Sequence, residues 1–204
     1  METSSQVHAG DITRRSTTNE FVEVIEWLGS LPHKRCRIKI ITGGNHDHYL
    51  DEDFGGFREK QKILALMEFN KLTYLEHQFY QLPPELGSLR LFVSPYAPIH
   101  LGGAFMLEDM SNIWNDIPPV DILVSHTPPF GYQDQVIRNS RHVGCCYLRD
   151  KIKQIKPKVS IFGHIHEAHG YTFDEEGILY INACLNDYRY RPINTPITFD
   201  MSIE

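Results

Sequence analysis

The stretch VSIFGHIHEAHG, residues 159–170, carries the strongest signal for both the fold and the chemistry of this chain. Residues 159–162 form an apolar, β-favouring run that predicts a buried strand, and Gly163 lets the backbone turn sharply after it. In an extended segment, His164 and His166 project to the same side. A pair of imidazoles at a strand end suits Zn, Fe, Mn or Ni, but taken alone it fits a solvated or hydrogen-bonded loop equally well.

The length and composition of the chain predict one ordinary globular domain. Its 204 residues suit a single domain over residues 1–204, with 41% hydrophobic and 23% charged residues. The formal net charge of −6 argues against binding a nucleic acid polymer or an anionic membrane through a general basic surface. It does not exclude a small anionic substrate, because bound metal ions dominate the local potential.

Three features predict a cytoplasmic protein. The cysteines, at positions 36, 145, 146 and 184, lack the spacing of a zinc clip and predict free thiols in a reducing compartment. No apolar run approaches the roughly 18 residues that span a bilayer. The first residues lack the character of a targeting peptide.

Helices and strands alternate along the chain. Thr17 and Glu20 form a capping-box pattern before a helical apolar spacing that ends at Pro32. Two further helices are predicted over residues 57–69 and 144–157. Besides residues 159–162, strands are predicted at 37–42, 72–77, 89–96, 121–126, 178–183 and 196–201. This alternation favours a layered α/β fold.

Four strand candidates end in turns that carry Asp, Asn or His. Asp11 follows a possible short strand, Asn45 lies in TGGNHDHY after residues 37–42, and His126 ends residues 121–126. Sites in α/β sheets collect at the carboxyl ends of strands, where loops bring polar groups together. The alternative is four unrelated polar loops. Oxygen and imidazole donors of this kind suit Fe, Mn, Zn or Ni, and two such ions roughly 3.5–4 Å apart clamp a phosphoryl group for hydrolysis.

The four blocks resemble a known superfamily. Gly10-Asp11, GNHD at 44–47, Ser125-His126 and GHIH at 163–166 are similar, in order and spacing, to the calcineurin-like metallophosphoesterases. Within it, WLGSLP at 27–32 and HTPPFGYQD at 126–134 resemble the small metallophosphoesterase-domain branch. The resemblance implies an α/β fold of two mixed β-sheets packed face to face and flanked by helices.

The resemblance also implies a set of metal ligands. Asp11 would bridge two ions; Asn45, His126 and His164 would complete the shell of one ion, and His166 would belong to the other. Two of these positions have other interpretations. Asn45 could cap a helix or hold a left-handed turn, and His126 could be a satisfied, half-buried histidine.

Two further residues receive catalytic roles from the resemblance. His46 would lie beside the substrate, where it stabilises charge or protonates the departing oxygen. Asp47 would orient the His46 imidazole through its second nitrogen, and the alternative is that Asp47 is a local turn residue.

One part of the family pattern is absent from this sequence. The superfamily begins with a strand that ends in Asp-x-His, and residues 1–10 contain no such motif. The second ion would then keep only Asp11 and His166, so a shortened domain that lacks its first strand is expected. His8 could stand in as a ligand, but a position in a strand is the favoured interpretation.

The resulting functional hypothesis is a metal-dependent phosphoesterase. It would hydrolyse a small phosphomonoester or phosphodiester, for example a nucleotide or cyclic nucleotide, through attack by a metal-activated hydroxide. Divalent Mn, Fe, Zn or Ni is the expected cofactor. The first alternative is a catalytically impaired or inactive member that binds a nucleotide or a protein partner with one metal or none. The second is a chain too incomplete to fold stably.

Overall fold

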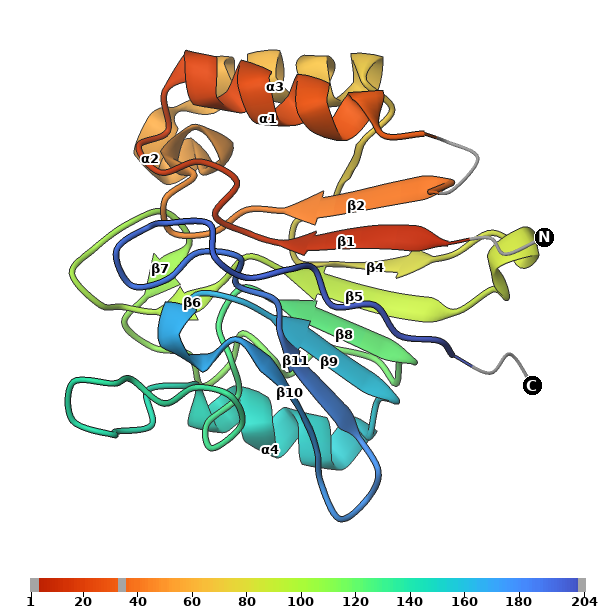
Figure 1. The fold of residues 1–204 in the computed structure, drawn as a ribbon, viewed down its shortest axis with the longest axis vertical. Helices are drawn as coiled ribbons and strands as arrows, with labels where there is room; N and C mark the ends of the chain where they lie inside the picture. The colour runs from red at the N-terminus through yellow and green to blue at the C-terminus, as the bar shows by residue number, and fades with distance from the viewer. Residues whose placement is uncertain (1–3, 33–35, 202–204) are drawn as a thin grey trace.

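The computed structural model describes residues 4–32 and 36–201, which form four layers (Figure 1). Helices α1 (Thr18–Ser30) and α3 (Phe57–Phe69) make the first layer, and a small sheet lies beneath them. A larger sheet packs against the other face of the small sheet. Helix α4 (Cys146–Ile155) covers the far face of the larger sheet.

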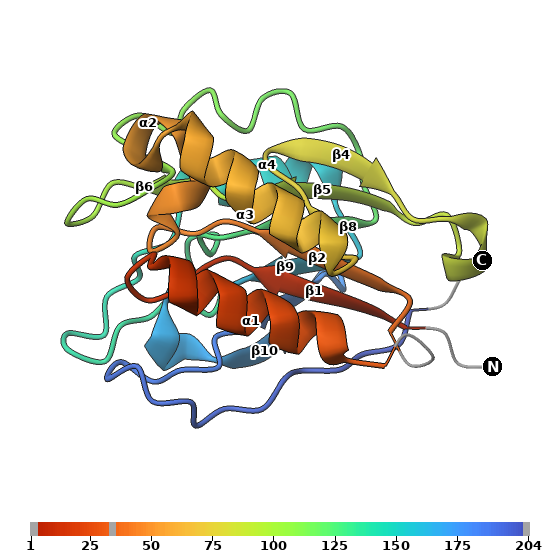
Figure 2. The same cartoon turned by 90° about the horizontal axis from the view of Figure 1, so that it is seen from above.

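The small sheet has three strands, which lie side by side in sequence order. Strands β1 (Ser5–Ala9), β2 (Ile38–Thr42) and β3 (Thr73–Tyr74) all pair in parallel. Helix α1 links β1 to β2, α3 lies between β2 and β3 in the chain, and Figure 2 shows both helices along one face of the sheet. The predicted capping box is confirmed, because the Thr17 hydroxyl accepts from the Glu20 amide and Glu20 accepts from the Thr17 amide.

The larger sheet has six strands with a parallel centre. Their order across the sheet is β10 (Gly170–Phe173), β11 (Leu179–Asn182), β9 (Val159–Phe162), β8 (Ile122–Ser125), β5 (Arg90–Ser94) and β4 (Gln78–Gln81). The two edge strands pair antiparallel, and the four inner strands pair in parallel. All four residues of β9 are buried, as its continuous apolar run predicts for a strand covered on both faces.

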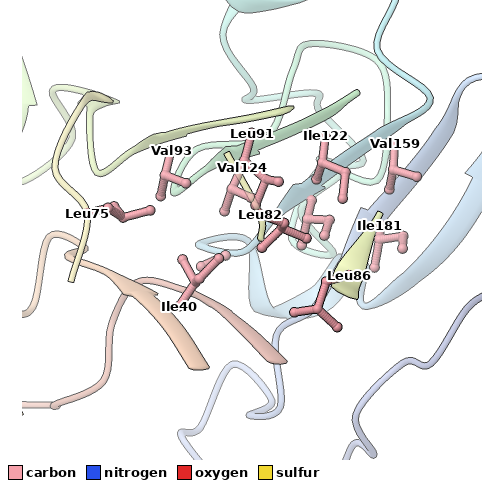
Figure 3. Close-up of a cluster of buried hydrophobic side chains, with 12 residues drawn as sticks. Ile40, Leu75, Leu82, Leu86, Leu91, Val93, Ile122, Val124, Val159 and Ile181 are labelled. Atoms are coloured by element: carbon pink, nitrogen blue, oxygen red, sulfur yellow. The ribbon is translucent and has the colours of Figure 1, made fainter. Parts of the chain in front are cut away.

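The principal core lies between the two sheets (Figure 3). Ala9 and Ile40 point into it from the small sheet, while Val93, Val124 and Ile161 point into it from the larger one. Alternate residues of these strands face the opposite layers, because side chains on a strand alternate between its faces. The core therefore fixes the carboxyl ends of strands from both sheets next to each other.

The remaining elements are short. A two-stranded sheet joins β6 (Ala97–Pro98) to β7 (Met106–Leu107). The short helices are η1 (His48–Leu50), α2 (Glu52–Gly55), η2 (Pro84–Leu86) and η3 (His166–Ala168). In the part of the chain that the structure describes, none of the helices combines the length and apolar composition that crossing a bilayer needs.

The layered α/β class with two packed sheets and flanking helices is confirmed, and two details differ from the sequence prediction. The small sheet is parallel throughout its described strands, not mixed. The strand predicted at residues 196–201 is wrong, because this segment pairs with no strand of the described residues. Ile197 and Met201 pack against the core between the sheets, so the apolar pattern is satisfied without backbone pairing.

Candidate metal centre

Four of the predicted ligands come together where strands of both sheets end. Asp11 follows β1 and Asn45 follows β2 in the small sheet. His126 follows β8 and His164 follows β9 in the larger sheet. These four residues are called the inner set below.

The ligand atoms of the inner set converge on one point. One atom each from Asp11, His126 and His164 lies within 4.8 Å of the other two. The Nε2 atom of His126 is 3.5 Å from Oδ2 of Asp11 and 3.0 Å from Oδ1 of Asn45. Ligands that share one ion at about 2 Å stand about 3 to 3.5 Å apart. The spacing of the inner set therefore fits a single divalent ion.

The tautomer of His126 supports the same conclusion. Its Nδ1 lies 2.9 Å from the carbonyl oxygen of Ala9, which can only accept, so the proton of the neutral ring is on Nδ1. The lone pair of Nε2 then faces the Asn45 amide and the Asp11 carboxylate. Two hydrogen-bond acceptor atoms that point at each other repel unless a cation lies between them. The arrangement of these atoms therefore fits a metal site.

Close backbone packing places Asp11 and His126. Gly10 has a φ of +93°, and a Cβ atom there would lie 2.4 Å from the Gly43 oxygen and 2.5 Å from Nδ1 of His126. Asp11 itself has a φ of 55° and His164 a φ of 68°, a left-handed region that non-glycine residues seldom adopt. Such backbone strain collects at functional sites, where the surrounding structure holds it.

The charges of the inner set suit metal binding. Burial and the neighbouring His126 lower the pKa of His164 to about 3, so its imidazole is neutral at pH 7. Burial opposes ionisation of Asp11, but His126, His164 and His46 outweigh it and lower the pKa of this carboxyl group. Both residues are therefore in the ligating form at neutral pH.

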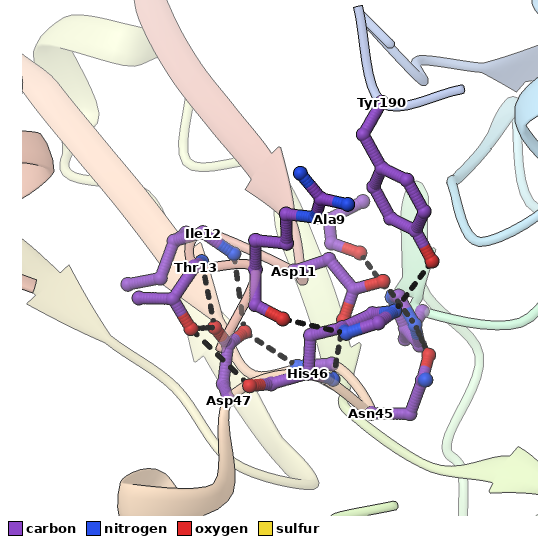
Figure 4. Close-up of polar contacts among 11 residues, drawn as sticks. Ala9, Asp11, Ile12, Thr13, Asn45, His46, Asp47 and Tyr190 are labelled. Carbon is purple, nitrogen blue, oxygen red and sulfur yellow. Dashed lines mark hydrogen bonds and ion pairs between the residues drawn. The ribbon is translucent and has the colours of Figure 1, made fainter. Parts of the chain in front are cut away.

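The predicted role of Asp47 in orienting His46 is wrong. Nδ1 of His46 lies 2.9 Å from the carbonyl oxygen of Arg14, which therefore fixes the ring (Figure 4). The buried carboxylate of Asp47 instead accepts from the Gly44 amide, the Thr13 hydroxyl and two backbone amides of the loop after Asp11. Burial and the Asp11 carboxylate raise the pKa of Asp47 to about 7. Asp47 ties the two ligand-bearing loops together.

His166 lies outside the inner set. Its Nδ1 is 2.9 Å from the carbonyl oxygen of Asp187, which leaves Nε2 as the ring nitrogen available to a ligand. It lines a cavity of about 230 Å³ together with Asp11 and His46. The second ion of the sequence prediction would thus have Asp11 and His166 on the cavity side of the centre.

His8 is a strand residue, as favoured from the sequence. It pairs with Ile41 in the β1–β2 ladder. Its buried Nδ1 has no hydrogen-bond partner among the described residues, and burial lowers the pKa of the ring to about 4. His8 is not one of the residues whose ligand atoms converge.

Two residues at the cavity had no signal in the sequence. The hydroxyl of Tyr190 lies 3.3 Å from Nε2 of His46 (Figure 4). The ring of Tyr190 is edge-on to both His46 and His166. The guanidinium of Arg14 lies over the Tyr190 ring. With His46 and His166 these residues are called the outer set.

Comparison with known proteins identifies the family. Residues 6–168 match the calcineurin-like phosphoesterases. The chain belongs to this family. The match spans all residues of the inner set and agrees with the resemblance drawn from the four sequence blocks.

Proteins similar in sequence to this chain support the assignment to the family. Metallophosphoesterase domain-containing protein 1 of Homo sapiens is 33% identical over 211 residues, which covers 96% of this chain and 64% of that protein. This chain therefore spans less than two thirds of that relative's length. A probable rhamnogalacturonate lyase C of Emericella nidulans is 36% identical over 169 residues, covering 80% of this chain but 15% of that protein.

Solved structures share the fold. Phosphopantetheinyl hydrolase from Mycobacterium tuberculosis aligns with a TM-score of 0.57 at 14% identity, covering 90% of this chain and 79% of that one. TT1561 of Thermus thermophilus aligns with a TM-score of 0.52 at 12% identity, covering 89% and 76% of the two chains. At these identities the likeness concerns the fold alone.

Proposed function

We propose that this chain is a metal-dependent phosphoesterase that hydrolyses a small phosphomonoester or phosphodiester. The observation that carries the proposal is the convergence of ligand atoms of Asp11, Asn45, His126 and His164 on one point. Membership of the calcineurin-like phosphoesterase family supports it. Mn, Fe, Zn and Ni are the candidate cations, because each accepts mixed oxygen and imidazole ligands.

Each residue of the site has a distinct role in this proposal. The inner set holds the cation, which supplies the Lewis acidity that activates water and neutralises charge on the phosphoryl group. His46 faces the cavity through Nε2, because Nδ1 is held by the Arg14 carbonyl. In its protonated form His46 donates the Nε2 proton to the departing oxygen. Asp47 positions the loops and does not touch the reacting atoms.

The lining of the cavity indicates the chemical character of the substrate. The cavity's volume of about 230 Å³ and its lining of Asp11, Arg14, His46 and Tyr190 favour a compact, polar ester. A nucleotide or cyclic nucleotide is a reasonable candidate by similarity to the family. The net charge of −6 favours a small-molecule substrate in a cytoplasmic protein over a nucleic acid polymer or a membrane surface.

A binding protein without turnover is the second candidate. The observation that favours it is that the converging ligand atoms supply one ion, while His166 lies outside that group. A second ion would have few protein ligands among the described residues. Such a protein would bind a nucleotide or a protein partner with one metal or none.

Metal counting together with a turnover assay separates these candidates. The purified chain is loaded with Mn²⁺, its metal content is measured by plasma mass spectrometry, and bis(p-nitrophenyl) phosphate and p-nitrophenyl phosphate serve as substrates. Hydrolysis of either ester by the wild type, together with its loss in the Asn45→Ala variant, supports the enzyme. One ion or none per chain, with neither ester hydrolysed, supports the binding protein.

A further inference from the structure

Residues 184–194 form a strap whose tip carries Tyr190 to the edge of the metal centre. The Asp187 carboxylate accepts hydrogen bonds from the backbone amides of Arg189 and Arg191 and from the Arg191 guanidinium. The Tyr190 amide donates to the Asp187 carbonyl, and Tyr190 has a left-handed φ of 60°. The position of the Tyr190 ring is therefore set by a built turn.

The strap is also joined to the catalytic loops. Nδ1 of His166 donates to the Asp187 carbonyl, and the Tyr190 hydroxyl reaches Nε2 of His46. The ring centroid of Tyr190 is 5.1 Å from that of His166 and 5.6 Å from that of His46. Tyr190 thus stands on the boundary between the two histidines of the outer set and solvent.

Arg14 rests on this ring. Its guanidinium carbon is 4.6 Å from the Tyr190 ring centroid, a cation–π contact. Ion pairs in the described part of the chain occupy Arg90, Arg149 and Arg191, and none of them includes Arg14. The planar group therefore keeps its N–H donors available while the aromatic ring holds its orientation.

The guanidinium borders the same cavity as the reactive groups. Arg14, Tyr190, His46, His166 and Asp11 all line it. Glu20 and Glu23 line it too. The Glu20 carboxylate already accepts from the Arg15 amide and from the Thr17 amide and hydroxyl, and the ion pairs of the described residues join neither glutamate to Arg14. An oriented cation beside a metal centre, with no ion-pair partner among the described carboxylates, is suited to an anionic oxygen of the ligand.

We propose that Arg14, held on the Tyr190 ring, binds the non-bridging oxygens of the substrate's phosphoryl group and makes the site prefer dianionic phosphomonoesters over monoanionic phosphodiesters. This inference rests on the proposed phosphoesterase function. The fork of a guanidinium matches two phosphoryl oxygens, and the second negative charge of a monoester strengthens that contact. Arg14 is thereby a substrate-binding residue, and Tyr190 is a positioning residue that acts through it.

The experiment compares two substrates in the wild type and three variants of the Mn²⁺-loaded protein. Arg14→Met lowers kcat/KM for p-nitrophenyl phosphate about 10- to 100-fold, mainly by raising KM. The same variant lowers kcat/KM for bis(p-nitrophenyl) phosphate by a smaller factor. Arg14→Lys keeps the charge but not the fork, and recovers only part of the loss. Arg15→Met removes a positive charge from the adjacent residue, which does not line the cavity. This control leaves kcat/KM for both substrates unchanged. Thermal melting verifies that each variant folds.

Variants of Tyr190 test whether its ring positions the Arg14 guanidinium. Tyr190→Phe retains the ring under Arg14 and keeps the wild-type KM for the monoester, whereas Tyr190→Leu raises that KM. Tyr190→Leu added to Arg14→Met has little further effect on KM, because both changes remove one interaction. Additive effects of Tyr190→Leu and Arg14→Met on KM would show that Tyr190 does not act by positioning Arg14.

Binding of inorganic phosphate, measured by isothermal titration calorimetry, separates the two proposals. A dissociation constant about tenfold weaker in Arg14→Met than in Arg15→Met supports the anion contact. Equal phosphate affinities in Arg14→Met and Arg15→Met would overturn the anion contact, and so would equal losses of kcat/KM for the monoester and the diester. In either case, a wild type that hydrolyses one of the esters still supports the phosphoesterase function. A wild type that hydrolyses neither ester contradicts the proposed function itself.

Discussion

The inner and outer sets meet at one centre but are built differently. Asp11, Asn45, His126 and His164 directly follow core strands, and His126 is fully buried. Arg14 and Tyr190 of the outer set are exposed and lie on loops held by hydrogen bonds. The strand ends can hold fixed ligands for an ion, while the loops can adapt to a substrate.

This difference predicts that the two sets can be separated by mutation. Removing an inner residue takes away a ligand, so metal content and turnover fall together. Removing Arg14, His46 or Tyr190 of the outer set changes how the ester is bound or protonated, so metal content stays constant. The tests below address this separation in order of decreasing effect.

His164→Ala should give the largest effect. It removes an inner ligand, and with it the several kcal/mol of charge stabilisation that the cation supplies, so turnover falls at least about 10³-fold. Plasma mass spectrometry should show that the ion is lost as well. His100→Ala, which removes an exposed histidine outside both sets, is the control and should retain metal and activity. Full metal content in His164→Ala would contradict the ligand assignment.

His46→Ala should slow the reaction without releasing the metal. The loss of a proton donor lowers kcat about 10²-fold, while the inner set is intact. Metal content and kcat are measured on the same preparation. Loss of the ion in this variant would place His46 in the inner set and remove the distinction between the two sets.

Gly10→Ala should act on the inner set through the backbone. The new Cβ atom would collide with the Gly43 oxygen and the His126 ring, at a positive φ that alanine disfavours, so stability falls by about 1–3 kcal/mol and metal affinity falls with it. Gly177→Ala is the matched control, because Gly177 has a φ of +82° but nothing within 4 Å of the added atom. Melting and metal titration on both variants isolate the collision. Equal metal affinities would contradict it.

The sequence predicted that the strand ends bring Asp11, His126 and His164 together, and their role as metal ligands stays a prediction. Residues 57–69 form α3 as predicted, and residues 159–162 form β9 with His164 directly beyond it. These predictions succeed because strand and helix patterns are local, and parallel strands bring their carboxyl ends to one edge. The inner set follows from that arrangement once the four blocks are recognised.

The outer set could not be predicted in the same way. His46 is oriented by the carbonyl oxygen of Arg14, a group that every residue carries and that no motif marks. Tyr190 reaches His46 from 144 positions away, through a strap fixed by Asp187. The strand predicted at residues 196–201 failed for a related reason, because alternating apolar residues specify burial but not a pairing partner.

The smallest predicted effect is a pH dependence of the metal-free protein. Burial lowers the pKa of His8 from 6.5 to about 4, so below pH 6.5 the unfolded chain takes up a proton that the folded chain does not. The free energy of unfolding therefore decreases as pH falls through this window, by at most about 2 kcal/mol at pH 5 from this residue. Denaturant unfolding at pH 7 and pH 5 measures it. His8→Gln should show a smaller decrease, and an equal decrease would exclude His8 as the source.

The position of the ion itself tests the central claim most directly. A crystal of the Mn²⁺-loaded protein, measured at the manganese absorption edge, gives an anomalous difference map that locates the ion without reference to the protein density. We predict a peak enclosed by Asp11, Asn45, His126 and His164. A peak that lies away from His126 and His164, or no peak in a protein that still hydrolyses phosphate esters, would contradict it.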